Sequence, residues 1–116
     1  MLDGLTAPYV KIRKRPDFLA ANRGKRFVTP GFILLAFDRR DSEPTKRLGI
    51  TVTKKVGNAV IRNRMKRRFR ALAAEFLPKA GISGTDHILI GRAGGIERDF
   101  QEMRRDMARA LKKLSR

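Results

Sequence analysis

The chain has 116 residues, with 28 Lys and Arg against 11 Asp and Glu, so its formal net charge is +17. Such an excess of positive charge is typical of proteins that bind nucleic acid, and an anionic membrane surface is the main alternative. The sequence contains no cysteine, which excludes disulfides, thiol nucleophiles and cysteine-based zinc sites. The single histidine, His87, argues against histidine-rich metal sites and most histidine-based catalysis.

Length and hydropathy limit the domain organisation and the location. The chain is long enough for one compact RNA-binding domain, which we place at residues 11–116, after a flexible lead-in at residues 1–10. The sequence has no run of about 18 apolar residues, so we expect no membrane-spanning segment. The first residues also lack the apolar core of a secretion signal. We therefore expect a cytoplasmic protein without a membrane partner.

The first half of the chain is predicted to form a short helix and three strands. Residues 11–15, KIRKR, are a basic run that is either a solvated tail or a contact for phosphate. Pro16 and Gly24 delimit a short helix. In this helix Phe18 either anchors the helix to a core or offers a flat surface on which a base can stack. The three strands are predicted at residues 27–29, 32–38 and 46–53.

The strand at 46–53 alternates in polarity, and we expect it to pair antiparallel with residues 32–38. Its apolar side chains should pack on the next helix, and its small and hydroxylated side chains should face solvent or a ligand, unless the threonines serve strand propensity alone. The first set is Leu48, Ile50 and Val52, and the second is Gly49, Thr51 and Thr53.

Residues 58–76 are predicted to form a long helix that is apolar on one side and basic on the other. Gly57 and Asn58 are a turn and helix-start signal, and Pro78 should end the helix. Between Glu43 and Glu75 the sequence has ten Lys or Arg and no acidic residue. Like charges at this spacing repel one another, and a polyanion along the basic side would relieve the repulsion. The apolar stripe is formed by Ile61, Met65, Phe69, Leu72 and Phe76, with Arg68 close to its edge.

The rest of the chain completes an α+β fold. A short buried strand is predicted at residues 85–92, in which His87 has no chemical role. A second amphipathic helix is predicted at residues 97–114, with acidic residues early and lysines late, which matches the helix dipole. The elements therefore follow the order helix, three strands, helix, strand, helix, with the helices packed on a small sheet.

The stretch Lys54–Arg70 resembles the signature of the bacterial ribonuclease P protein component, a KxGNAVxRNRxKR pattern that contains the RNR motif at Arg62–Asn63–Arg64. The early Asp17–Phe18 pair and the Leu-Gly-Ile-Thr-Val-Thr strand agree with it, so the resemblance covers about residues 10–114. It implies a small mixed sheet like that of the second domain of ribosomal protein S5. It also implies a left-handed crossover through the RNR helix, whereas the general rule for parallel strands is right-handed.

The resemblance also implies a function in which the partner RNA is the catalyst. That RNA, with the Mg2+ ions that it mainly binds itself, removes the 5′ leader of precursor tRNA. The protein, without catalytic residues or an obligate protein partner, binds the RNA and the single-stranded leader. The motif positions that match the catalytic-RNA role are Lys54, Lys55, Asn58, Arg62, Asn63, Arg64, Lys66, Arg67 and Arg70. Those that match the leader cleft are Phe18, Phe32, Thr51 and Thr53.

Two positions depart from relatives that carry further aromatic residues in the cleft, because this chain has Asn22 and Leu35 there. Stacking on the leader should accordingly be weaker, and backbone contacts more important. Three alternatives to this function are an RNA-binding protein without enzymatic activity, a self-sufficient nuclease and a DNA-binding protein. A nuclease would need clustered carboxylates or an acid–base pair, and residues 44–74 contain no carboxylate. A DNA-binding role is not favoured, because nothing in the sequence resembles a helix-turn-helix motif.

Overall fold

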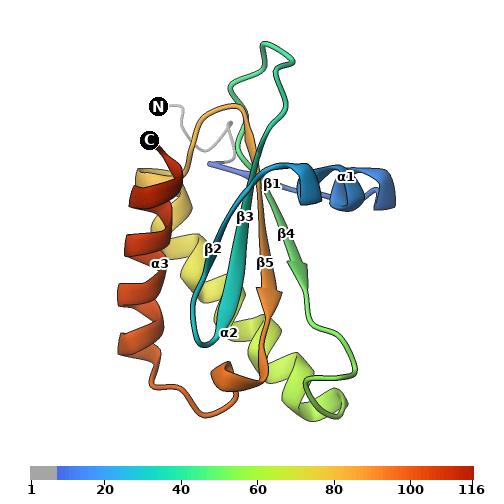
Figure 1. Ribbon diagram of the computed structural model, residues 1–116, viewed down its shortest axis with the longest axis vertical. Helices are drawn as coiled ribbons and strands as arrows, with labels where there is room; N and C mark the ends of the chain where they lie inside the picture. The colour runs from blue at the N-terminus through green and yellow to red at the C-terminus, as the bar shows by residue number, and fades with distance from the viewer. Residues whose placement is uncertain (1–7) are drawn as a thin grey trace.

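The computed structural model describes residues 8–116, which form a five-stranded mixed sheet with helices on both faces (Figure 1). The strand order is β1-β4-β5-β3-β2. Helices α2 and α3 lie on one face, and α1 lies on the other. In chain order, the elements are β1 Val10–Lys11, α1 Arg15–Ala20, η2 Ala21–Arg23, β2 Lys25–Val28, β3 Phe32–Asp38, β4 Arg47–Thr51, α2 Ala59–Ala80, β5 Thr85–Gly91, η3 Ala93–Gly95 and α3 Phe100–Leu114.

The sheet confirms the α+β class but corrects one predicted pairing. Strand β4 does not pair with β3, because β5 lies between them, antiparallel to β3 and parallel to β4. Ile88 and Leu89 of β5 point to opposite faces of the sheet, and both are buried. A strand that is apolar on both faces is best placed at the centre of a sheet, where both faces are covered.

Strand β1 was not predicted. Val10 and Lys11 pair in parallel with Arg47 and Leu48 of β4. Val10 therefore belongs to the sheet rather than to the lead-in expected at residues 1–10, and residues 1–7 lie outside the described part of the chain.

The connection from β4 through α2 to β5 is a left-handed crossover. In Figure 1 both strands point downward, α2 returns behind the sheet, and the chain moves from β4 on the right to β5 on the left. This arrangement is the uncommon hand for two parallel strands, and it agrees with the expectation that came from the family resemblance.

Helix α2 begins as predicted and ends later than predicted. The side chain of Asn58 caps it by accepting a hydrogen bond from the Ile61 amide at 3.0 Å. Pro78 lies inside the last turn, so the prediction that it ends the helix was wrong. Proline removes only one hydrogen bond there, and the carbonyls of the last turn find other donors. Lys46 Nζ donates to Leu77 O at 3.0 Å and to Pro78 O at 3.2 Å.

The main core lies between the sheet and the two longer helices. Its rings of Phe32 and Phe69 meet edge to face, with centroids 5.9 Å apart. Leu48 and Val52 point into this core, which confirms the alternation predicted for β4. A smaller core of Ile12, Ala21, Leu35 and Ile88 lies under α1. Within residues 8–116, no helix is both long enough and apolar enough to cross a bilayer.

Helix α3 begins at Phe100, three residues later than predicted, because Asp99 caps it by accepting a hydrogen bond from the Glu102 amide at 3.3 Å. The predicted amphipathic character of this helix is confirmed, since Met103, Met107 and Leu111 are buried in the main core.

Candidate RNA-binding surface

Helix α2 and the turn before it present a continuous basic surface. Arg62 and Lys66 are half-buried, and Arg62 Nε donates to Gly57 O at 3.2 Å, which holds its guanidinium against the helix start. The Oδ1 of Asn58 already accepts the Ile61 amide, so Asn58 has a structural task as the helix cap. The other predicted members are exposed to solvent: Lys54, Lys55, Asn63, Arg64, Arg67 and Arg70.

Arg68 differs from its basic neighbours. As expected, it lies beside the apolar stripe, but its head group is bound by the protein itself. Its Nη2 donates to Arg98 O at 2.6 Å and its Nη1 to Gly95 O at 3.3 Å. The guanidinium also lies 5.5 Å from the centroid of the Phe100 ring, within range of a cation–π contact. Arg68 therefore ties α2 to the start of α3.

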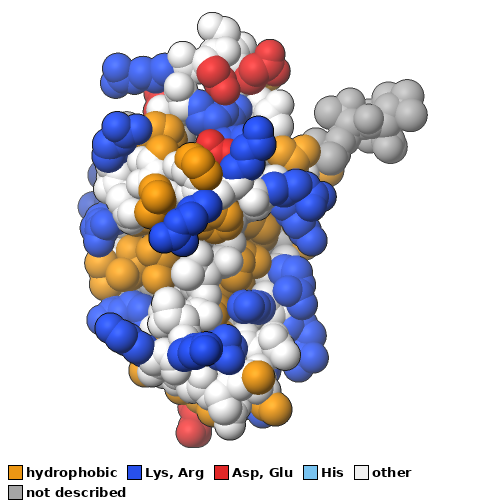
Figure 2. All heavy atoms as spheres, turned by 90° about the vertical axis from the view of Figure 1, so that its right-hand side faces the viewer, with side chains coloured by type: hydrophobic (Ala, Val, Ile, Leu, Met, Phe, Trp, Pro, Cys, Tyr) orange, Lys and Arg blue, Asp and Glu red, His pale blue; other side chains and the backbone are white. Residues whose placement is uncertain are grey.

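Lys and Arg dominate the side of the molecule on which α1 and β4 lie (Figure 1 and Figure 2). Figure 2 shows them along the whole height of this side, while Asp and Glu are few and hydrophobic side chains are visible between the basic ones. Glu75, the first acid in the sequence after Glu43, is engaged by Arg104 of α3. This hydrogen bond lowers the pKa of Glu75 and keeps it ionised. The positive charge of the preceding helical turns is therefore left without an acidic partner on α2.

A groove of about 450 Å³ lies on the other face of the sheet, beside α1. Its floor is apolar and includes Leu35, Ile88 and Ile90, while Arg13 and Arg15 add positive charge. Phe18, Asn22 and Thr51 also line it. An apolar surface with cations around it can accept a stacked base and the phosphates on either side of that base.

Phe18 reaches this groove because β4 carries glycine at position 49. A Cβ atom at Gly49 would lie only 2.6 Å from Phe18 Cε1. The ring therefore lies directly over the strand backbone, half-buried, with the rest of its surface open to the groove.

Two of the residues predicted to bind the leader, Phe32 and Thr53, do not line the groove. Phe32 is completely buried and contacts Phe69 in the main core, so no base can stack on it. Along β3, the even-numbered residues Phe32, Leu34 and Ala36 face α2, and the odd-numbered ones face the side of α1. The groove is therefore lined by Leu35 rather than by Phe32. Thr53 is exposed but follows β4, outside the set that lines the groove.

A second, smaller groove joins the two surfaces. Phe18, from α1, and Lys66 and Arg70, from α2, line it together with Lys11 of β1. Lys66 and Arg70 are four residues apart and share one face of the helix, so helical spacing could have placed them together. No local pattern in the sequence shows that this face points toward α1, because its direction depends on the position of β4 between β1 and β5 in the sheet.

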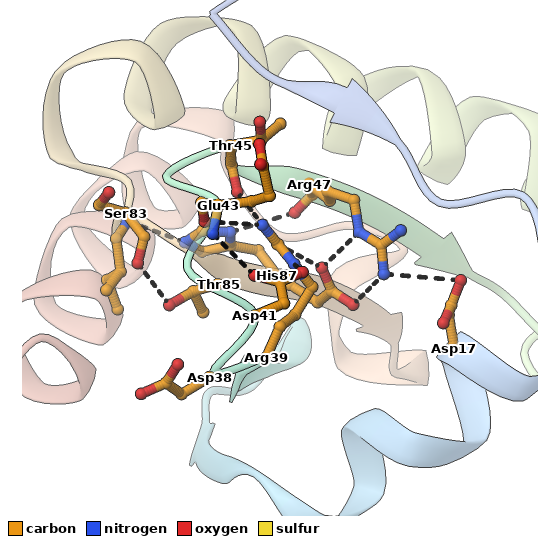
Figure 3. Close-up of polar contacts among 12 residues, drawn as sticks. Asp17, Asp38, Arg39, Asp41, Glu43, Thr45, Arg47, Ser83, Thr85 and His87 are labelled. Atoms are coloured by element: carbon orange, nitrogen blue, oxygen red, sulfur yellow. Dashed lines mark hydrogen bonds and ion pairs between the residues drawn. The ribbon is translucent and has the colours of Figure 1, made fainter.

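A polar network lies at the end of the sheet where β5 begins (Figure 3). Asp86 is buried and accepts hydrogen bonds from Arg47 Nε at 2.6 Å, Arg47 Nη2 at 2.7 Å and Arg39 Nη1 at 2.9 Å. Burial alone would raise the pKa of Asp86, but these hydrogen bonds and the two positive charges lower it below its ordinary value. The carboxylate is therefore charged and fully engaged.

His87 points to the opposite face and is completely buried. Its Nε2 accepts the Ile82 amide at 3.0 Å, so the proton is on Nδ1, which donates to Arg47 O at 3.1 Å. Burial lowers the pKa of His87, so the ring is neutral at pH 7. These contacts give the ring a structural role. Across residues 8–116, no three His, Cys, Asp or Glu side chains gather as a metal site would require.

Comparison with known proteins agrees with this architecture. A family model described as Ribonuclease P matches residues 7–115. The ribonuclease P protein component of Erythrobacter litoralis is 61% identical over 102 residues, which covers 88% of this chain and 83% of the relative. That of Gluconacetobacter diazotrophicus is 44% identical over 104 residues, covering 89% of each chain.

Solved structures show the same fold. The RNase P protein of Staphylococcus aureus matches with a TM-score of 0.74 and 28% identity, over 91% of this chain and 97% of that one. The RNase P protein from Thermotoga maritima matches with a TM-score of 0.72 and 29% identity, over 90% and 94%. These matches confirm the resemblance that began with the RNR motif. The chain belongs to the ribonuclease P protein family.

Proposed function

We propose that this chain is the protein subunit of ribonuclease P, which binds the catalytic RNA and the single-stranded 5′ leader of precursor tRNA. The observation that carries the proposal is the presence of two distinct basic surfaces on one small domain. One is the basic, solvent-facing side of α2, and the other is the groove between α1 and the sheet.

The α2 surface suits a folded RNA. Its cations project from a rigid helix whose opposite side is fixed in the main core, so their spacing is set before the RNA arrives. Arginine pairs with phosphate through two parallel hydrogen bonds, which orients the helix on the RNA backbone. We assign to this surface Lys54, Lys55, Asn58, Arg62, Asn63, Arg64, Lys66, Arg67 and Arg70, with Lys66 and Arg70 also able to reach the leader through the second groove.

The groove suits a single strand. Phe18 offers the open part of its half-buried ring to an unpaired base, Thr51 offers a hydroxyl, and Arg13 and Arg15 offer charge to phosphates. Asn22 and Leu35 line the same groove but have no aromatic ring, so the stacking of a base in this groove depends on Phe18. We accordingly expect weak dependence on leader sequence.

In this proposal the protein breaks no bond. It increases the affinity of the ribozyme for a substrate that still carries its leader, and it lowers the Mg2+ concentration that the RNA needs because its cations neutralise phosphate. The Mg2+ ions of the reaction belong to the RNA, and no described residue is assigned to them.

Cleavage of precursor tRNA by the catalytic RNA at low Mg2+, with and without the protein, tests the proposal. We expect cleavage to be slow without the protein and fast with it. Polylysine at the same total charge is the control for simple neutralisation. Equal rates with the protein and with polylysine would contradict the proposal.

A further inference from the structure

Helix α1 is the weakest-held element among those that form the groove. It has six residues, all of them at least partly exposed, and every hydrophobic side chain of the smaller core under it comes from neighbouring segments apart from Phe18. The position of such a short helix depends on its few contacts with the rest of the protein rather than on its own stability.

Two consecutive residues of α1 attach it to alternate residues of β4. Asp17 Oδ2 lies 3.5 Å from Arg47 Nη2, and the Phe18 ring lies over Gly49. Arg47 and Gly49 both point to the α1 face because they are two residues apart on one strand. The ion pair and the ring contact therefore fix both the height and the lateral position of α1 over the sheet.

The arginine in this pair is itself held rigidly. Both Nε and Nη2 of Arg47 donate to the carboxylate of Asp86, whose side chain is 1% exposed, and Arg39 Nη1 donates to the same carboxylate. In Figure 3, Arg47 extends from β4 toward Asp17 on α1. A chain of charges thus runs from the buried Asp86 at the start of β5 to α1, which forms one wall of the groove.

We infer that Asp17 and Arg47, anchored by Asp86, are positioning residues that hold α1 at the distance from β4 at which the groove accepts a single-stranded leader. The inference rests on the leader-binding function proposed above for the groove. It assigns to Asp17 a role in RNA binding although its charge has the same sign as RNA.

Because Asp17 and RNA are both negatively charged, a charge effect and a positioning effect predict opposite results when Asp17 is replaced. If Asp17 acted only through its charge, its removal would raise the net charge and strengthen RNA binding. If it positions α1, its removal weakens the binding of the leader while the α2 surface is unchanged. We therefore expect Asp17→Asn to reduce the affinity of the holoenzyme for precursor tRNA about two- to fivefold, the size expected for one partly exposed ion pair.

The experiment compares the affinities of the reconstituted holoenzyme for precursor tRNA and for leaderless tRNA. The positioning role predicts a loss for precursor tRNA alone and restoration of most of the affinity in Asp17→Glu. It predicts no loss in the charge-matched control Glu97→Gln, whose exposed side chain lines neither of the two grooves beside α1. A gain or no change in Asp17→Asn, or an equal loss for both RNAs, would overturn the inference.

Two further variants separate this inference from the proposed function. Gly49→Ala would place a methyl group against the Phe18 ring and should displace α1 independently of charge, with about a tenfold loss for precursor tRNA. The melting temperature of Gly49→Ala is measured first. If this variant does not fold, the comparison of Asp17→Asn with Asp17→Glu decides alone.

If Phe18→Ala loses affinity for the leader and Asp17→Asn does not, the positioning role is wrong and the function stands. If neither loses affinity, the leader-binding function itself is wrong.

Discussion

The two faces of the sheet are covered very differently. On one face, the long helices α2 and α3 bury Phe32, Phe69 and Leu89 completely. On the other face, the six-residue α1 leaves Ile33 and Ile90 partly exposed beside a groove. The polar groups differ as well, because β5 directs the neutral His87 to the first face and the charged Asp86 to the second.

This difference separates stability from binding. Buried apolar area stabilises the fold, and the α2 face supplies most of it. The α1 face keeps apolar surface open to solvent, which weakens the fold but provides a place for an unpaired base. Four predictions examine this division, from the largest expected effect to the smallest.

Replacing the phenylalanine on each face should have unequal effects on stability. Phe69→Ala leaves a cavity in the main core and should lower the free energy of unfolding by about 3–5 kcal/mol. Phe18→Ala, the matched variant on the α1 face, should lower it by less than half as much because its ring is half-exposed. Urea unfolding of the two variants provides the measurement. Equal losses would show that the faces do not differ in this way.

The buried network on the α1 face should matter more than an exposed ion pair. Asp86→Asn leaves Arg47 and Arg39 without their shared negative partner and should cost about 2–3 kcal/mol, less than for a fully buried pair because Arg47 is 25% exposed. Glu75→Gln, which removes the exposed partner of Arg104, should change the unfolding free energy far less. If the two variants unfold at the same urea concentration, the buried network does not stabilise the fold more than the exposed ion pair does.

The α2 face should make stability depend on pH below neutrality. The pKa of His87 is lowered in the folded protein, so the unfolded chain binds a proton first as pH falls below about 6.5. Stability is therefore complete above this pH and decreases as the pH falls toward the folded pKa, by at most about 1.4 kcal/mol per pH unit. His87 is the only histidine, so His87→Gln should flatten the dependence between pH 7 and 5.5. An unchanged slope in that variant would assign the effect to other groups.

The exposed cations of α2 should affect RNA binding with little effect on the fold. Arg67→Ala should change the unfolding free energy by no more than about 0.5 kcal/mol, because the side chain is exposed. It should also reduce the slope of log affinity against log salt for the catalytic RNA by about 0.9 if it contacts a duplex phosphate, and by about 0.7 for a single strand. Equal slopes for the variant and the wild type would show that Arg67 contacts no phosphate.

Local patterns predicted the helices better than the sheet. The spacing of Met65, Phe69 and Leu72 located the buried side of α2, and Asn58 located its start, because both depend on residues within one or two turns. The strand order was not predictable in this way. Residues 32–38 and 85–91 are both apolar runs, and which of them neighbours β4 depends on the crossover through α2 rather than on either run.

The residues of the site could likewise be predicted only where local spacing determines their direction. The basic residues of α2 could be identified from the sequence because helical spacing fixes their direction. Phe32 was placed in the leader cleft by resemblance, but the register of β3 turns it into the main core. The Asp17–Arg47–Asp86 contacts join residues up to 69 positions apart, from Asp17 to Asp86, and no local pattern connects them.

The central claim is that α2 binds the catalytic RNA and the α1 groove binds the leader. It is tested most directly by measuring two affinities for two variants: that of the protein for the catalytic RNA, and that of the holoenzyme for precursor relative to leaderless tRNA. We predict that Arg67→Ala weakens the affinity for the catalytic RNA and leaves the ratio of precursor to leaderless tRNA affinity unchanged. Phe18→Ala should leave the affinity for the catalytic RNA unchanged and lower that ratio. Equal losses of both quantities in both variants would contradict the claim.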